Sequence, residues 1–311
     1  MKDTRQRMRR AGAAAVVLAG CACCHAGAPN GENPWAKLDE PATERPLVVA
    51  RLLADAAAVR PGATVTLGVL FDIEKNWHIY WKNPGQAGVA TEVTFAAPPG
   101  AAVGPLTYPV PRTFADPGGI VTYGYAGRVL LTARARMPKT LEPGSTVTFK
   151  AAASWLACKD KCVLGSADLV LRLPVAAPNA RPAPANASLF AAWAGLLPVA
   201  AGEKACPAAV AVAGRVDPRQ GGGRFDVALT WKGPAPSRAE VYPGPAAAAT
   251  VSRVTARTDG KRTVVGFTVT TLKGLARSGK TLEVLVVAVG PGKRARGVVL
   301  TVPLAGESNT K

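Results

Sequence analysis

The sequence predicts an all-β protein with two β-sandwich domains in tandem after an export leader. Of the 311 residues, 27 are prolines and 32 are glycines, and the hydrophobic share of 48% contains few aromatics. This composition suits many short strands joined by punctuated turns better than long helices. Apolar residues also alternate with polar ones in short segments along most of the chain, as in half-buried strands. The length leaves room for two domains of ordinary size.

The first 28 residues have the features of an export signal. Lys2 and four arginines precede an apolar run at residues 11–20 that is too short to span a bilayer. Residues 18–21 resemble the bacterial lipobox, so we expect Cys21 to be lipidated and to become the mature N-terminus. Ordinary cleavage after Ala28, which would discard Cys21, stays open. Either route places the mature chain in the periplasm or cell envelope. On the lipobox route we expect membrane contact through the lipid anchor only.

Basic residues give the chain a formal net charge of +18, of which residues 201–311 carry +10. They are scattered through predicted strands and turns. The densest cluster, at residues 293–296, has no aromatic residues interleaved with it on which bases would stack. The charge therefore indicates a solvated surface, and we expect no nucleic-acid partner.

Shifts in composition suggest the domain boundaries. After the leader (1–28) and a tether (29–44), a first domain covers residues 45–177 and a second covers residues 201–311. A proline-rich linker with a short helix joins them at residues 178–200. Ser188 is expected to cap this helix, and Pro198 to end it. Its apolar residues share one face: Leu189, Phe190, Trp193, Leu196 and Leu197.

Alternating segments predict the strands of both domains. In the second strand, Thr64, Thr66 and Gly68 are expected to face away from the core. The second domain contains one cysteine, Cys206, for which we predict a buried or free thiol and no chemistry. First-domain strands are predicted near residues 47–53, 64–71, 77–81, 128–136, 147–155 and 169–175, and second-domain strands near 227–231, 265–269, 282–286 and 298–302.

Cys158 and Cys162 form the only closely spaced cysteine pair outside the leader, and they lie near a reversal between two predicted strands. A closed turn there can bring both sulfurs within bonding distance. Lys159 and Lys161 flank the pair and would favour the thiolate that thiol–disulfide exchange needs. The alternative is a static clip, which in the chain-entropy treatment would stabilise the fold by only about 2 kcal/mol.

His78 is the only histidine after the leader and lies in the most aromatic segment of the chain, residues 76–85. A packed strand that ends in an Asn-Pro-Gly turn is the simpler interpretation. A cysteine hydrolase that pairs His78 with Cys158 or Cys162 stays open, but no third catalytic member or oxyanion motif is recognisable. One histidine supplies too few ligands for a copper or zinc site, so we expect no metal.

Several segments in order carry a family resemblance: residues 77–85, 91–93, 123–127 and 154–165. Together they resemble the N-terminal periplasmic domain of the disulfide transducer DsbD, most closely its ScsB-like branch, which shares the Cys-x3-Cys spacing. The resemblance implies an immunoglobulin-like sandwich with a redox-active cysteine pair and no cofactor. We extend the immunoglobulin-like architecture to the second, smaller sandwich.

The resemblance also implies a protein-disulfide reductase type of activity connected with cytochrome c biogenesis. Electrons would pass from a membrane-embedded thiol reductant to periplasmic thioredoxin-like proteins. Since the chain shows no membrane domain before Lys311, we expect that reductant to be a separate protein. The alternative is a non-redox envelope scaffold lipoprotein whose cysteine pair is structural.

The resemblance and the neighbouring residues together suggest roles for individual site residues. Residues 116–125 are either a plain hairpin corner or a loop that caps the cysteine pair, and the cap would involve Asp116, Thr122, Tyr123 and Tyr125, with Tyr123 as the shield. Cys158 follows an apolar run, whereas Cys162 follows a charged one, so we expect Cys162 to be the more exposed. Cys162 is therefore predicted to attack and Cys158 to resolve.

Overall fold

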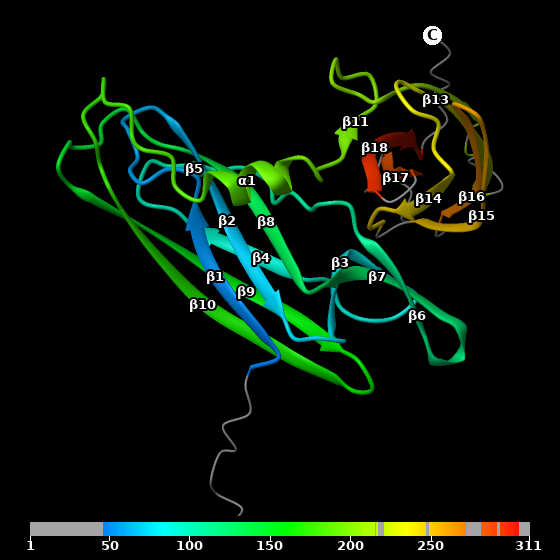
Figure 1. Ribbon diagram of the computed structural model, residues 1–311, viewed down its shortest axis with the longest axis horizontal. Helices are drawn as coiled ribbons and strands as arrows, with labels where there is room; N and C mark the ends of the chain where they lie inside the picture. The colour runs from blue at the N-terminus through cyan, green and yellow to red at the C-terminus, as the bar shows by residue number, and fades with distance from the viewer. Residues whose placement is uncertain are drawn as a thin grey trace, which may run out of the picture. The chain divides into compact units, whose positions relative to one another are not determined.

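The computed structural model describes residues 46–214, 216, 221–246, 249–271, 281–290 and 293–304, without the side chains of residues 116, 117 and 293–296. Pro46–Lys311 form one compact unit. In the described part almost every element is a strand, and the strands form four sheets (Figure 1). The predictions for the leader, the tether and Cys21 lie outside the described residues.

Two sheets make the first sandwich. The first sheet has the antiparallel order β1-β2-β8-β5. The second has the order β10-β9-β3-β7-β6, with β4 also paired to β9. The strands are β1 (Val48–Ala54), β2 (Thr64–Ile73), β3 (His78–Gly85), β4 (Glu92–Ala96), β5 (Ala102–Val103), β6 (Arg112–Asp116), β7 (Ile120–Ala126), β8 (Arg128–Arg136), β9 (Thr146–Cys158) and β10 (Cys162–Pro174).

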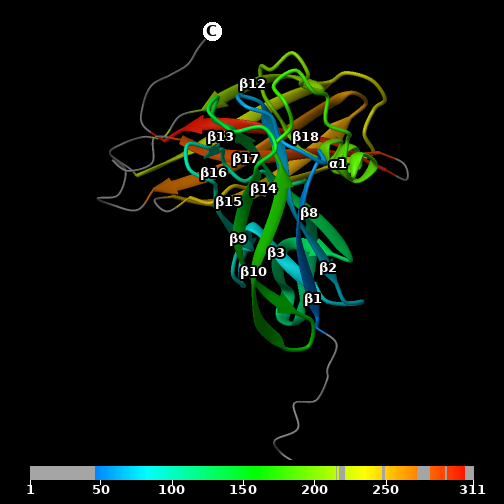
Figure 2. The same ribbon diagram turned by 90° about the vertical axis from the view of Figure 1, so that its left-hand side faces the viewer.

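Side-chain alternation builds the core between these sheets. Every second residue of β2 and β9 points inward, and Phe71 meets Trp155 edge to face with ring centroids 5.5 Å apart. Figure 2 shows β9 and β10 side by side as a long hairpin. It pairs residue for residue from Cys158 opposite Cys162 to Thr146 opposite Pro174. The alternating pattern thus predicted these strands correctly, and the strand expected at residues 128–136 is β8.

A single described α-helix, α1 (Ala187–Ala194), covers the outer face of the first sheet. Phe190 lies over Gly68, where an added Cβ would come within 3.0 Å of the ring carbon Cζ. Gly68 therefore faces away from the core, as predicted, but is buried by the helix. The expected cap was wrong: Asn186 precedes the first turn in a left-handed conformation without a side-chain cap. The helix ends at Ala194, with Gly195 as its C-cap.

The proline-rich segment before α1 is bonded to the first sandwich. The amide of Ala57 donates to the carbonyl of Ala183 at 2.9 Å, and the amide of Ala185 donates to the carbonyl of Asp55 at 2.8 Å. These bonds hold the segment against the first sandwich, while most of its side chains are exposed. Backbone groups that bond in this way keep the segment beside the residues that follow β1.

The second sandwich also has two sheets, ordered β11-β18-β17-β14 and β12-β13-β16-β15. Phe225 and Phe267 stack inside it with centroids 5.5 Å apart. The four strands that the sequence predicts for this domain are β13, β16, β17 and β18. The strands are β11 (Val199–Ala200), β12 (Ala208–Gly214), β13 (Gly222–Trp231), β14 (Arg238–Pro243), β15 (Ala249–Asp259), β16 (Arg262–Thr271), β17 (Thr281–Gly290) and β18 (Lys293–Pro303).

Cys206 lies in the core of the second sandwich, with 3% of its surface exposed. Its thiol donates to the carbonyl of Ala208 at 3.1 Å. The buried thiol agrees with the prediction. None of the helices among the described residues is both long and apolar enough to cross a membrane.

Candidate functional site

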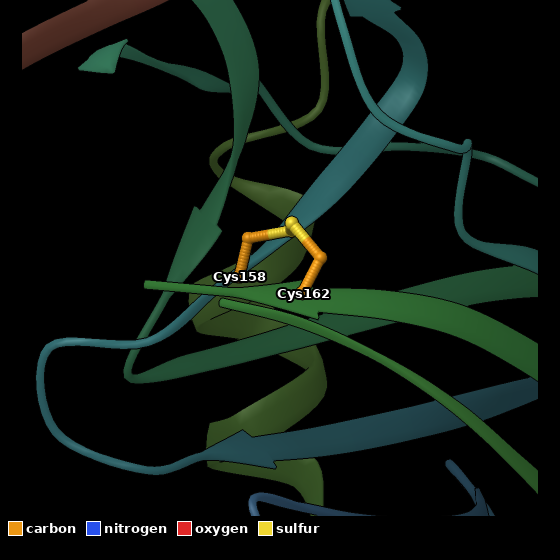
Figure 3. The surroundings of a disulfide bond; sticks show 2 residues. All are labelled: Cys158 and Cys162. Carbon is orange, nitrogen blue, oxygen red and sulfur yellow. A yellow bond between two sulfur atoms is a disulfide. The ribbon is translucent and has the colours of Figure 1, made fainter. Parts of the chain in front are cut away.

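A disulfide bond joins Cys158 and Cys162 at the tip of the β9–β10 hairpin (Figure 3). The two residues are directly opposite in the antiparallel ladder, with Cα atoms 4.2 Å apart. Between them the chain turns through three residues, and the amide of Lys159 donates to the carbonyl of Lys161 at 3.1 Å. The predicted reversal is therefore present, and it brings both sulfurs together.

The disulfide lies on the outer face of its sheet, away from the hydrophobic core. In β9 the core residues occupy odd positions, such as Trp155 and Ala157, so the even-numbered Cys158 points outward. Cys158 is nevertheless only 3% exposed, whereas Cys162 on the edge strand is exposed. The expected difference in exposure is thus present, and some other part of the chain must cover Cys158.

His78 and Phe114 supply part of that cover. His78 is the cross-strand neighbour of Cys158 in the β3–β9 pair and is only 5% exposed. The ring of Phe114, from β6, stacks on the imidazole with centroids 4.4 Å apart and an angle of 14°. Tyr80 meets the same imidazole edge to face at 5.1 Å. An aromatic layer therefore covers the sheet beside the buried cysteine.

The predicted cap segment is the β6–β7 hairpin, and its two faces have different neighbours. On one face, Phe114 lies opposite the buried Thr122 in the ladder. On the other face, Thr113 lies opposite Tyr123, whose ring meets Tyr242 of β14 at 5.1 Å. Tyr123, the expected shield, therefore lies on the face opposite to that of Phe114.

Two further cap residues complete the hairpin. Asp116 ends β6, and its side chain lies outside the described part. Tyr125 is 4% exposed and donates its hydroxyl to the carbonyl of Pro109 at 2.7 Å. Burial raises the pKa of the Tyr125 phenol well above its usual range, so this hydroxyl stays protonated and acts as a structural donor.

Two glycines permit close packing around the site. An added Cβ on Gly124 would lie 2.1 Å from the carbonyl oxygen of Ile79, so the hairpin backbone comes very close to β3. An added Cβ on Gly165 would lie 2.4 Å from Nε1 of Trp155, because the indole lies across this glycine. Without side chains, both glycines therefore let the strands that carry the covering residues and the cysteines pack this closely.

The surface beside Cys162 combines charge and apolar side chains. Lys159 and Asp160 form an ion pair of 3.3 Å with both side chains exposed, so water screens the effect of Lys159 on the sulfurs. Val163 is 37% exposed and Leu164 is 76% exposed. Leu164 shares the outer face of β10 with Cys162, because side chains two residues apart point the same way.

No group of three or more His, Cys, Asp or Glu side chains with metal-binding geometry occurs in the part of the chain that is described. His78 does lie beside Cys158, as a cysteine hydrolase would require. The sulfur of Cys158, however, is bonded to that of Cys162. The arrangement in this structure is that of an oxidised thiol pair.

Sequence comparison connects this arrangement with a known family. Residues 49–174 match the family model described as thiol:disulfide interchange protein DsbD, N-terminal. The predicted resemblance is thereby confirmed over these residues, which include both cysteines and the β6–β7 hairpin. Among curated proteins, none matches the chain.

Solved structures extend the likeness to the fold. The N-terminal periplasmic domain of ScsB from Proteus mirabilis has a TM-score of 0.56 and 20% sequence identity, over 82% of this chain and 93% of that one. The N-terminal domain of DsbD from Neisseria meningitidis, in the reduced form, has a TM-score of 0.25 and 12% identity, over 40% and 83%. At such identities a likeness shows the fold alone, and the ScsB domain confirms the predicted all-β, immunoglobulin-like architecture.

The sequence pattern predicts no role for Phe114 or Tyr242. Phe114 stands two residues before Asp116 in a segment where charged and small residues hide any clear period. Tyr242 is separated from Tyr123 by more than a hundred residues, so no local pattern connects them. The nearness of Phe114 to residues 116–125 is the one sequence signal that points to it.

Proposed function

We propose that the chain is a thiol:disulfide exchange module in which Cys162 is the attacking residue and Cys158 the resolving one. In the reduced protein, the Cys162 thiolate attacks a disulfide sulfur of the partner and forms a mixed disulfide, and the departing partner thiolate takes up a proton. The Cys158 thiolate then attacks the Cys162 sulfur. This step re-forms the Cys158–Cys162 bond and releases the partner as a dithiol, so two electrons have passed to it.

The observation that carries this proposal is the unequal exposure of two bonded cysteines on the outer face of a sheet. An incoming sulfur reaches Cys162, which is exposed, while Cys158 stays covered beside His78. The attacking sulfur is therefore the exposed one, and the resolving sulfur is the covered one.

A purely structural disulfide would add little stability at this place. The β9–β10 hairpin is already paired along its whole length, and the loop closed by the bond is very short. In the chain-entropy treatment such a loop contributes only about 2 kcal/mol. Stability alone is thus a weak reason for the pair, and the scaffold alternative is the less favoured one.

For the cap, we assign the shielding ring to Phe114 in place of Tyr123. Phe114 stacks on His78, the neighbour of Cys158, whereas Tyr123 faces Tyr242. Thr122, opposite Phe114, belongs to the same covering face. The hairpin would shield the pair between transfers and lift when a partner arrives.

Location and partners belong to the same proposal. The similar ScsB structure is a periplasmic domain, and an export leader predicts the same compartment for this chain. We propose that a separate membrane-embedded thiol reductant and periplasmic thioredoxin-like proteins are the exchange partners, and that the lipid on Cys21 holds the module at the membrane. The proposed division is a redox sandwich at residues 45–177 and a second sandwich at residues 201–311.

Single-cysteine variants test the exchange. Cys158→Ser leaves the exposed Cys162 without its resolving partner, so this variant should accumulate mixed disulfides with envelope thiol proteins, visible on non-reducing gels. Cys162→Ser is the matched control and should trap much less. If neither variant traps a partner and the wild-type reduction potential lies below about −300 mV, the disulfide is structural and the scaffold alternative holds.

A further inference from the structure

Tyr242, on β14, packs into the first sandwich. It is fully buried, and its ring meets those of Tyr123 at 5.1 Å and Trp81 at 6.1 Å, both edge to face. The side chain also belongs to the hydrophobic core of the first sandwich. A residue of the second sandwich thus contributes directly to the part of the molecule that carries the cysteines.

Tyr242 touches both strands of the β6–β7 hairpin. Its ring contacts Tyr123 of β7, and its hydroxyl accepts a long hydrogen bond of 3.4 Å from the Thr113 hydroxyl of β6. The same hydroxyl donates to Oε2 of Glu240 at 2.5 Å, and Arg238 pairs with that carboxylate at 2.8 Å. Glu240 therefore fixes the orientation of the phenol that meets the hairpin.

Alternation places the hairpin between two aromatic contacts. Thr113 and Phe114 are consecutive residues of β6, so their side chains point to opposite faces. One face carries Phe114 on His78, and the other carries Thr113 and Tyr123 on Tyr242. A hairpin that moves as a unit to uncover Cys158 must separate from Tyr242 or carry it along.

Contacts elsewhere fasten the second sandwich to the strand that carries His78. Nδ2 of Asn83, on β3, donates to the carbonyl of Pro243 at 2.9 Å, and Lys82 forms an ion pair with Glu283 of β17. These contacts do not involve the hairpin. The second sandwich and β3 therefore form a common support, against which the hairpin closes.

We propose that Tyr242 is a positioning residue that holds the β6–β7 hairpin closed over the cysteine pair and so limits access to Cys158. The inference rests on the proposed exchange function and gives the second sandwich a role in it. Loss of the ring should raise the fraction of time that the hairpin is open. Loss of the hydroxyl contact alone should have a smaller effect in the same direction.

Alkylation of a single reduced thiol tests this inference. In a Cys162→Ser background, Cys158 is the thiol under the cover, and its rate of reaction with iodoacetamide measures opening. Tyr242→Ala should raise this rate about tenfold, because an aromatic contact of this kind is lost. Thr113→Val, at an exposed position, should raise it about twofold without disturbing the core. Glu283→Gln, which removes the ion pair with Lys82, is the matched control and should leave the rate unchanged.

The possible outcomes separate cleanly. Faster alkylation in both hairpin-contact variants, with Glu283→Gln at the wild-type rate, supports the proposal. Unchanged alkylation rates in Tyr242→Ala and Thr113→Val overturn the proposal. An equal rise in Glu283→Gln also overturns it, since that result indicates a general loosening between the sandwiches. If Tyr242→Ala fails to fold, the alkylation rate of Thr113→Val and the hydrogen exchange of its hairpin amides test the proposal instead. Trapping by Cys158→Ser reports the exchange function separately and needs no Tyr242 variant.

Discussion

Phe114 stacks on His78 with ring centroids 4.4 Å apart, so a residue from β6 covers the strand neighbour of Cys158. This contact joins two segments that are not adjacent in the sheet, since β7 lies between them. The stacked pair therefore joins the hairpin to the strand that lies beside the disulfide.

Removing the Phe114 ring should expose Cys158. We expect Phe114→Ala to raise the alkylation rate of Cys158 about tenfold in a Cys162→Ser background, because a stacked aromatic pair is worth up to about 1.5 kcal/mol beyond its buried area. Ile120→Ala is the control, since Ile120 lies on the same hairpin but is 39% exposed. Equal rates in the wild type and Phe114→Ala would show that Phe114 does not shield the thiol.

Reduction of the disulfide should change stability only slightly. We expect the free energy of unfolding to fall by about 2 kcal/mol when the Cys158–Cys162 bond is reduced, since the closed loop is short. Urea unfolding of the oxidised protein and of the Cys158→Ala, Cys162→Ala double variant measures the difference. Loss of folding in the double variant would instead identify the bond as a structural requirement.

We predict that a partner bonded to Cys162 also covers Leu164, which is 76% exposed on the same outer face. Leu164→Lys should slow the exchange with a protein disulfide about tenfold, because the buried area of a leucine side chain is lost from the encounter. Reduction by dithiothreitol should be unaffected. Val170→Lys, at an exposed position of the same face far from the pair, is the matched control. An equal effect of both variants would argue against docking at this surface.

Gly165 tests the packing beneath the site. Gly165→Ala places a methyl group 2.4 Å from Nε1 of Trp155, so the indole must move and the free energy of unfolding should fall by about 1–3 kcal/mol. Gly104→Ala is the control, because its new methyl group would meet its nearest neighbour at an ordinary 3.5 Å. Urea unfolding compares the two. A neutral Gly165→Ala would mean that Trp155 has room to relax.

The strands with one buried face were predictable, because their sequence alternates. β9 and β13 have this pattern. β8 is buried on both faces in its first half. β15 was missed because most of its side chains are exposed on both faces and supply no apolar period. The helix was predicted from its apolar face, but its cap was not, because Asn186 adopts a left-handed conformation that no residue pattern revealed.

The cysteine pair and its turn were also predictable, since both depend on residues close in sequence. The cover was not. Phe114 reaches His78 because the β6–β7 hairpin lies against β3 with the bare backbone of Gly124 at the contact, and that closeness is a property of the folded sheet. The place of Tyr123 in the cap segment predicts a shield, whereas its position in the ladder turns it toward Tyr242.

The segment after α1 sets the length of chain that joins the two sandwiches. The carbonyl of Leu196 still accepts a hydrogen bond from Val110, and Val199 already pairs with Val298 of β18. Only Leu197 and Pro198 lie between these fixed points, and a residue before proline has a narrowed choice of backbone angles. So short a connection keeps the local concentration of Tyr242 near the hairpin high, and an opened hairpin would meet the same phenol again as soon as it returned.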